Sequence, residues 1–346
     1  MTHLATGVPG SRRLRRLERG ALWAACATAL SLTASGCVVV HGERVVLPSA
    51  TRAEAAKALD RFTAAYNKAD QAYDASLDAA YTTGALGAID AARLKAGKVN
   101  NPGGNPQHTP LVLSDVTYTI PKKAGWPRWF VADARANKGG DARWVLVFTR
   151  GDLSEPWQAA YLTLVAQGAL PEFSKDKDGW AEAVPADSAE LTRAPEDLSK
   201  EYTAYLTDGG GVFADGAYTN TLRTTRAKNA EKPGLVQQYV DEPLSAGEFA
   251  PLALRTADGG ALVFFASHHY VKQTAATGAS VPAPNVSVKA LTTGEIKQSL
   301  TMEFVANEIA LDPVKGSGDG KVLVAEPARG VDRREGRVKP PRAYAP

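Results

Sequence analysis

The spacing of apolar positions from Ala55 onward predicts a helix. From Ala55 to Leu77, apolar side chains recur every three or four residues, which is the period of a helix with one buried face. This stripe consists of Ala55, Leu59, Phe62, Tyr66, Ala69, Tyr73 and Leu77. Gly84 and Gly87 then interrupt the pattern, and residues 89–94 predict one more helical segment.

The period shortens to two after the turn-forming residues 100–106. Runs rich in β-branched and aromatic residues predict strands at 111–120, 129–135, 144–150 and 157–165. The Gly-containing segment 137–141 predicts a hairpin between the second and third of these strands. Residues 168–187 are polar and irregular, so they predict a loop.

The second half repeats this plan loosely. Residues 196–206 predict a helix that begins after Pro195. Residues 249–256 and 262–271 predict a second hairpin around Asp258-Gly259-Gly260. A long strand is expected at 298–311 and a short edge strand at 321–324, before an Arg-, Gly- and Pro-rich end typical of disorder.

Two blocks of helix, hairpin and long strand predict an α+β fold with two tandem units, each a helix on a curved antiparallel sheet. This element order resembles cystatin-like and nuclear-transport-factor-like folds. A single irregular α+β domain fits the same order and remains the alternative. The expected division is a cleaved signal peptide (1–36), a tether (37–50), a first domain (51–188), a second domain (189–332) and a disordered tail (333–346).

The amino terminus has the three zones of an export signal. A segment with five arginines between Arg12 and Arg19 precedes an uncharged, Ala- and Leu-rich run from Ala21 to Ala34, and small residues follow directly. The uncharged stretch reaches Val40, about the 20 residues that a spanning helix needs, so an uncleaved anchor is the alternative. Polar residues near the end of the run favour cleavage.

The sequence Leu32-Thr-Ala-Ser-Gly-Cys37 resembles a bacterial lipoprotein box. The resemblance implies cleavage between Gly36 and Cys37, a diacylglycerol on the Cys37 sulfur and an acyl chain such as palmitate on the new amine. It also implies attachment at the outer face of the cytoplasmic membrane. Ala34 departs from the Leu that the box prefers three residues before the cysteine. Arg12-Arg13 resembles the start of a twin-arginine signal, so the general and twin-arginine routes both stay open.

Cleavage changes the charge and the cysteine count. It removes five arginines and one glutamate, so the formal charge of +3 becomes −1. The remaining chain has no basic block with interleaved aromatic residues, which argues against nucleic-acid binding. Of the two cysteines, Cys26 leaves with the signal peptide and Cys37 carries lipid. Disulfides, thiolate catalysis and cysteine-based metal sites are then excluded.

No catalytic constellation, cofactor motif or metal motif is recognisable. His268 and His269 are neighbours on a predicted strand, so their side chains point to opposite faces and do not serve one mononuclear metal site. Ser267 beside His268 is not a catalytic triad. The calcium-loop-like segment 174–179 has Pro185 where the bidentate Glu is required.

The tryptophans Trp129, Trp144 and Trp157 fall on the first predicted sheet. They either line a pocket for an apolar or sugar ligand or fill the core between helix and sheet. We therefore expect a non-enzymatic envelope lipoprotein that binds a small molecule or a protein partner. Its Ala-, Gly- and Arg-rich composition resembles uncharacterised actinobacterial lipoproteins. An envelope enzyme with a cupped-sheet pocket and a structural or assembly module remain alternatives.

Overall fold

The computed structural model describes residues 45–324. The predicted cleavage site at Gly36 and Cys37 and the predicted tail at 333–346 lie outside the described residues.

The predicted first helix is present but ends earlier than the apolar stripe. Helix α2 (Arg52–Ala72) starts at a capping box, in which Glu54 N donates to Thr51 Oγ1 at 3.1 Å and Thr51 N donates to the Glu54 carboxylate at 2.8 Å. It ends because Tyr73 adopts a left-handed conformation with φ 51°. Leu77 therefore falls in the separate 3₁₀ turn η2 (Ala75–Leu77). Helix α3 (Gly84–Asn100) is longer than predicted and includes Gly87.

Four predicted strands form an antiparallel sheet in the order β2-β4-β5-β6. They are β2 (Leu113–Thr119), β4 (Arg128–Ala136), β5 (Arg143–Arg150) and β6 (Gln158–Val165). The predicted hairpin through residues 137–141 is confirmed by the register of β4 and β5, in which Arg135 faces Arg143.

The other strands of the described part form a larger sheet around β11 (Ala261–Ala275). Strand β11 pairs on one side with β12 (Ser299–Asp312) and on the other with β10 (Leu252–Arg255) and then β9 (Leu235–Leu244). The predicted second hairpin and long last strand are thus confirmed. The shorter strands are β1 (Leu47–Pro48), β3 (Pro121–Lys123), β7 (Ala181–Val184), β8 (Glu231–Lys232) and β13 (Leu323–Val324).

Three helices accompany the larger sheet. Helix α4 (Leu198–Asp208) follows the 3₁₀ turn η3 (Pro195–Asp197), as the pattern after Pro195 predicts. Helix α5 (Ala217–Ala230) and helix α6 (Val286–Leu291) were not predicted. Strand β9 was not predicted either, because polar residues interrupt its apolar positions and its sequence therefore resembles a loop. Strand β7 likewise lies inside the segment expected to be irregular.

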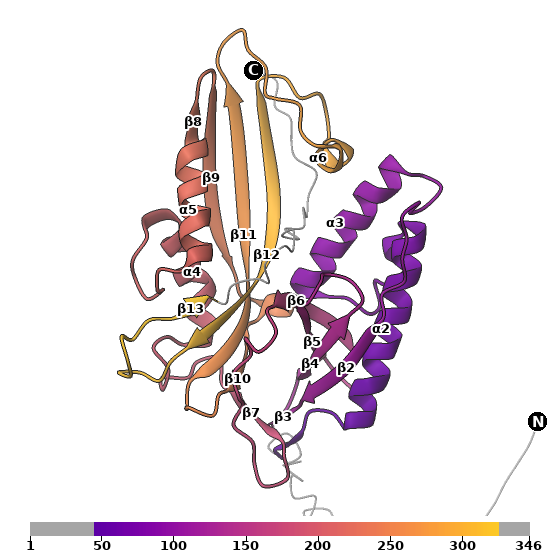
Figure 1. Cartoon of the computed structure of the whole chain (residues 1–346), viewed down its shortest axis with the longest axis vertical. Coiled ribbons are helices and arrows are strands. Elements are labelled where there is room, and N and C mark those ends of the chain that lie inside the picture. Colours follow the sequence, from indigo (N-terminus) through magenta and orange to yellow (C-terminus); the bar gives the residue numbers. More distant parts are fainter. Residues whose placement is uncertain (1–44, 325–346) are drawn as a thin grey trace, which may run out of the picture. The chain divides into compact units, whose positions relative to one another are not determined.

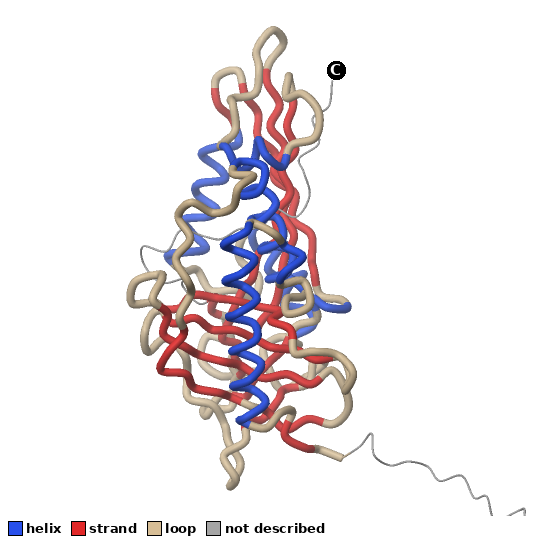
Figure 2. The backbone as a smooth tube through the Cα atoms, turned by 90° about the vertical axis from the view of Figure 1, so that its right-hand side faces the viewer, coloured by secondary structure: helices blue, strands red, loops and turns tan. Residues whose placement is uncertain are grey.

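The elements stack as helix, sheet, sheet and helix (Figure 1). Helix α2 runs across one face of the four-stranded sheet, as Figure 2 shows, and Phe62 packs there against Phe148. The other face of that sheet packs on the larger sheet, with Trp129 and Phe264 in the shared core. The far face of the larger sheet is covered by α4, where Tyr202 contacts Phe265.

The structure is an α+β fold, as expected. The domain division at 188 and 189 stays a prediction. Strands β3 and β7 precede that boundary in sequence but belong to the larger sheet.

Replacing Asp312 with Asn should flatten the pH dependence of stability. Burial raises the pKa of Asp312 from 3.8 to about 7. The folded state therefore holds its proton more tightly than the unfolded state, and stability falls as the pH rises from about 4 to 7. We expect Asp312→Asn to raise the free energy of unfolding by about 2 kcal/mol relative to the wild type at pH 8 and by little at pH 4. Urea unfolding measures both values. The exposed Asp187→Asn is the control, and equal gains for both variants would contradict the prediction.

Candidate ligand-binding cavities

The larger of two notable cavities lies where β3, β7 and β10 come together, beside Val46. It has a volume of about 730 Å³, and we call it the tryptophan cavity because Trp129 and Trp180 contribute to its wall. Most of the remaining wall is apolar, and the lysines Lys122, Lys123 and Lys175 also line it. Its two acidic residues are already paired, Asp176 with Lys122 and Glu182 with Arg255. The apolar wall includes Val46, Pro127, Val184, Pro185, Pro251 and Leu252. A concave apolar space with a few charged groups is the usual form of a small-molecule site.

The three tryptophans singled out from the sequence have different places. Trp129 is buried in the core between the sheets and also lines the tryptophan cavity. Trp144 is buried under α2, where its Nε1 donates to the Lys138 carbonyl at 3.2 Å. Trp157 packs edge-on against Phe130 with ring centroids 5.0 Å apart. Trp157 also lines a surface hollow of about 190 Å³ beneath Arg150.

Trp180, which sequence reasoning did not single out, is placed by the loop that resembles a calcium site. Asp176 Oδ1 accepts from Asp178 N at 2.9 Å and from Trp180 N at 3.0 Å, which closes the loop around its first carboxylate. Lys122 pairs with the same side chain and lowers the pKa of Asp176. A lysine thus satisfies the carboxylate that a calcium ion would need. Within residues 45–324, no group of three or more His, Cys, Asp or Glu side chains is arranged to hold a metal ion.

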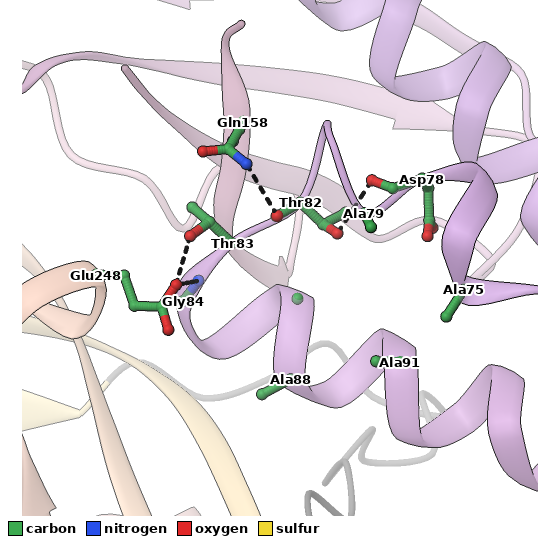
Figure 3. A pocket seen from close by; sticks show the side chains of 11 residues that line it. Ala75, Asp78, Ala79, Thr82, Thr83, Gly84, Ala88, Ala91, Gln158 and Glu248 are labelled. Atoms are coloured by element: carbon green, nitrogen blue, oxygen red, sulfur yellow. Dashed lines mark hydrogen bonds between the residues drawn. The ribbon is translucent and has the colours of Figure 1, made fainter. Parts of the chain in front are cut away.

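The second cavity, of about 420 Å³, lies beside the start of α3 (Figure 3). Glu248, from the 3₁₀ turn η4 (Gly247–Phe249), accepts from Thr83 Oγ1 at 2.7 Å and from Gly84 N at 3.2 Å. Gly84 has φ +54°, and a Cβ there would meet the Glu248 carbonyl at 2.6 Å, so only glycine fits. The carboxylate already occupies the positive end of the helix, which leaves no place there for a second anion.

A buried pair of carboxyl groups borders this second cavity. Burial, together with the neighbouring Asp90, raises the pKa of Asp78 well above its usual range. One oxygen of each carboxyl group lacks another hydrogen-bond partner, so a proton shared between them satisfies both. Asp90 is further paired with Arg93 at 2.8 Å, and Arg93 also contacts Asp70. The cluster is a closed network of charges between α2 and α3.

The neighbours His268 and His269 point to opposite faces of β11, as predicted. His268 Nε2 lies 2.7 Å from Glu303 Oε1 on the face toward the four-stranded sheet. On the opposite face, His269 Nδ1 lies 2.5 Å from Asp241 Oδ1 and His269 Nε2 lies 2.9 Å from Ser267 Oγ. The serine partner is thus His269 and not its direct neighbour.

The Ser267–His269–Asp241 chain has the connectivity of a catalytic triad but lacks access. Burial raises the pKa of Asp241, but hydrogen bonds from His269 and Arg226 outweigh it and lower the pKa overall. The Asp241 carboxylate thus faces His269 Nδ1, and the serine hydroxyl faces Nε2. Ser267, however, is 0 % exposed in the middle of the sheet. An acyl-transfer nucleophile must reach a substrate carbonyl, and this one is covered.

By these features, the described part of the chain is a layered α+β protein with a large, mainly apolar cavity and buried polar networks. It belongs to the family described as Domain of unknown function (DUF8094), which matches residues 46–333.

Relatives from Streptomyces cover nearly the whole chain. An uncharacterised lipoprotein of Streptomyces coelicolor is 68 % identical over 94 % of this chain and 98 % of its own length. An uncharacterised lipoprotein of Streptomyces avermitilis is 57 % identical with the same coverage. A second uncharacterised lipoprotein of S. coelicolor is 26 % identical over 59 % of each chain. No solved structure matches this chain.

Among the helices of the described residues, none is both long and apolar enough to cross a membrane.

Ser267 should not react with a fluorophosphonate probe in the folded protein. Its hydroxyl is buried and already bonded to His269, so the phosphorus atom has no approach to it. The intact mass after incubation should be unchanged, while a serine protease in the same tube is labelled. An adduct that disappears in Ser267→Ala would contradict this prediction and would reopen the hydrolase hypothesis.

Proposed function

We propose that the protein is exported and held at the outer face of the cytoplasmic membrane by lipid on Cys37. The three-zone amino terminus and the small residues before Cys37 support this proposal. So do the names of the relatives, which are lipoproteins that align over almost their whole length. The signal peptide would then end at Gly36, and the mature chain would begin with the acylated cysteine.

Replacing Cys37 should abolish both the lipid and the cleavage after Gly36. Cys37→Ala removes the sulfur that would accept diacylglycerol, so we expect an unprocessed chain with no acyl mass. Cys26→Ala, in the discarded segment, is the matched control and should yield the same mature mass as the wild type. Intact-protein mass spectrometry of the membrane fraction measures both. A wild-type mass equal to unmodified residues 1–346 would overturn the anchor.

The activity that we propose is non-enzymatic binding of a small amphipathic molecule in the tryptophan cavity. The observation that carries this proposal is the cavity itself, with about 730 Å³ of mainly apolar space and lysines at its wall. Burial lowers the pKa of Lys123, and its Nζ donates to the carbonyls of Ala124 and Trp126. Lys123 is therefore held in place, whereas Lys175 is exposed. An apolar chain or ring with an acidic end group fits these surroundings.

Filling the cavity should reduce binding of the anionic, aromatic probe 1-anilinonaphthalene-8-sulfonate. Ala183 lines the tryptophan cavity on β7, so Ala183→Trp should place an indole in the space that the probe needs. Ala88→Trp is the matched control because Ala88 lines the second cavity on α3. Fluorescence titration should give a weakened affinity for Ala183→Trp alone. Equal affinity for Ala183→Trp and wild type would contradict the assignment.

An envelope hydrolase is the second candidate, because Ser267, His269 and Asp241 are connected in the order that acyl transfer uses. The burial of Ser267 speaks against it, and the fluorophosphonate experiment distinguishes the two candidates. The resemblance of the two halves to cystatin-like or nuclear-transport-factor-like units stays a prediction.

A further inference from the structure

A group of apolar side chains is exposed where the described chain begins. Val46 is 58 % exposed, Leu47 is 51 % exposed and Trp126 is 42 % exposed. We call these three residues the tether-end patch. Val46 directly precedes β1, Leu47 belongs to β1, and Trp126 lies in the turn between β3 and β4. Figure 1 shows β3 at the lower end of the molecule.

Arg128 holds the residues of this patch together. Its Nη1 donates to the Leu47 carbonyl at 3.1 Å and to the Lys123 carbonyl at 2.7 Å. Its guanidinium carbon lies 5.6 Å from the centre of the Trp126 ring. The pairing of β1 with β3 also places Leu47 opposite Lys123. The contact of Arg128 with the Trp126 ring and the pairing of β1 with β3 therefore hold Leu47 and Trp126 in defined positions.

The charge around the patch is positive. Lys123 and Arg128 lie within it, and Lys175 lines the adjoining cavity together with Val46. The acidic side chains that line the same cavity are Asp176, which is paired with Lys122, and Glu182, which is paired with Arg255. A tryptophan among aliphatic side chains, bordered by lysine and arginine, is the composition that proteins place at the headgroup level of a bilayer. Phosphate groups of anionic lipids complement the cations.

The length of the tether sets where the bilayer lies. This step rests on the proposed lipid at Cys37. Nine residues lead from there to Val46, and even a fully extended chain of that length reaches at most about 30 Å. The tether-end patch is therefore the described surface that is covalently closest to the membrane.

We propose that the tether-end patch docks on the anionic bilayer to which the protein is anchored. Trp126, Val46 and Leu47 enter the headgroup region, and Arg128 and Lys175 contact lipid phosphates. Val46 belongs both to the patch and to the wall of the tryptophan cavity. Docking therefore turns the cavity toward the membrane, so an amphipathic ligand passes between bilayer and cavity without crossing bulk water.

The test uses a cysteine introduced at position 126 of the full lipoprotein. With Cys26 removed and Cys37 acylated, the new cysteine is the sole thiol and takes an environment-sensitive nitrobenzoxadiazole label. Val286→Cys is the control, because Val286 is 70 % exposed on α6 at the opposite end in Figure 1. Both proteins are purified in detergent and reconstituted in phosphatidylcholine vesicles with and without phosphatidylglycerol. Flotation and intact mass establish the anchor before any label is measured.

The label of Trp126→Cys should gain emission severalfold in vesicles with phosphatidylglycerol and should be quenched by nitroxide-labelled lipid. The Val286→Cys label should do neither. Adding Lys175→Glu should reduce the gain in anionic vesicles only. Equal signals at positions 126 and 286 in floated, lipidated protein would overturn the docking but leave the anchor intact. A signal that rises with protein density and not with phosphatidylglycerol would also overturn it, in favour of contact between two copies of this chain.

Discussion

Burial of β11 on both faces is the constraint on which the described fold depends. Its first seven residues, Ala261 to Ser267, are all buried, because the four-stranded sheet covers one face and α4 covers the other. A strand of this kind needs apolar side chains at every position. Phe264 fills the space between the sheets and Phe265 fills the space beneath α4, so both layers are joined to one strand. Ser199 of α4 reinforces the joint, since its hydroxyl donates to the Ala266 carbonyl and accepts from Leu244 N.

The same strand explains where polar groups occur. Beyond Ser267, only His269 and Ala275 of β11 are buried, and the other positions are partly or fully exposed. His269 is buried at this transition, and Asp241 and Ser267 satisfy its two ring nitrogens. Arg226, which lies on α5, also donates to the Asp241 carboxylate. A buried ion pair of this kind adds little net stability but strongly penalises arrangements that separate its members. We therefore interpret the triad-like chain as the feature that fixes α5 and β9 on β11.

Much of the order of elements can be predicted from the sequence, but the residues that meet at a site cannot. The strands that contain Trp144 and Phe264 have strong period-two or continuous apolar patterns, and the sequence predicts both strands. Strand β9 was missed because Val236 and Val240 are exposed and alternate with polar residues, so no apolar face marks it. Asp241 meets His269 only through the pairing of β9 with β11, a contact across 28 residues. Trp180 was overlooked because its loop is polar in sequence, although Asp176 folds that loop against Lys122.

The distribution of solvent access supports the proposed binding role. Ser267, which has the chemistry for nucleophilic work, is 0 % exposed and bonded to His269, and Asp78, which borders the second cavity, interacts with the buried Asp90. Catalysis needs such groups to change partners during the reaction, whereas a closed network resists that change. The larger of the two cavities, the tryptophan cavity, has a largely apolar wall in which Asp176 is already paired with Lys122. In the proposed function, its selectivity would rest on its shape and on lysines such as Lys123. A site that holds an amphiphile without altering it has these properties.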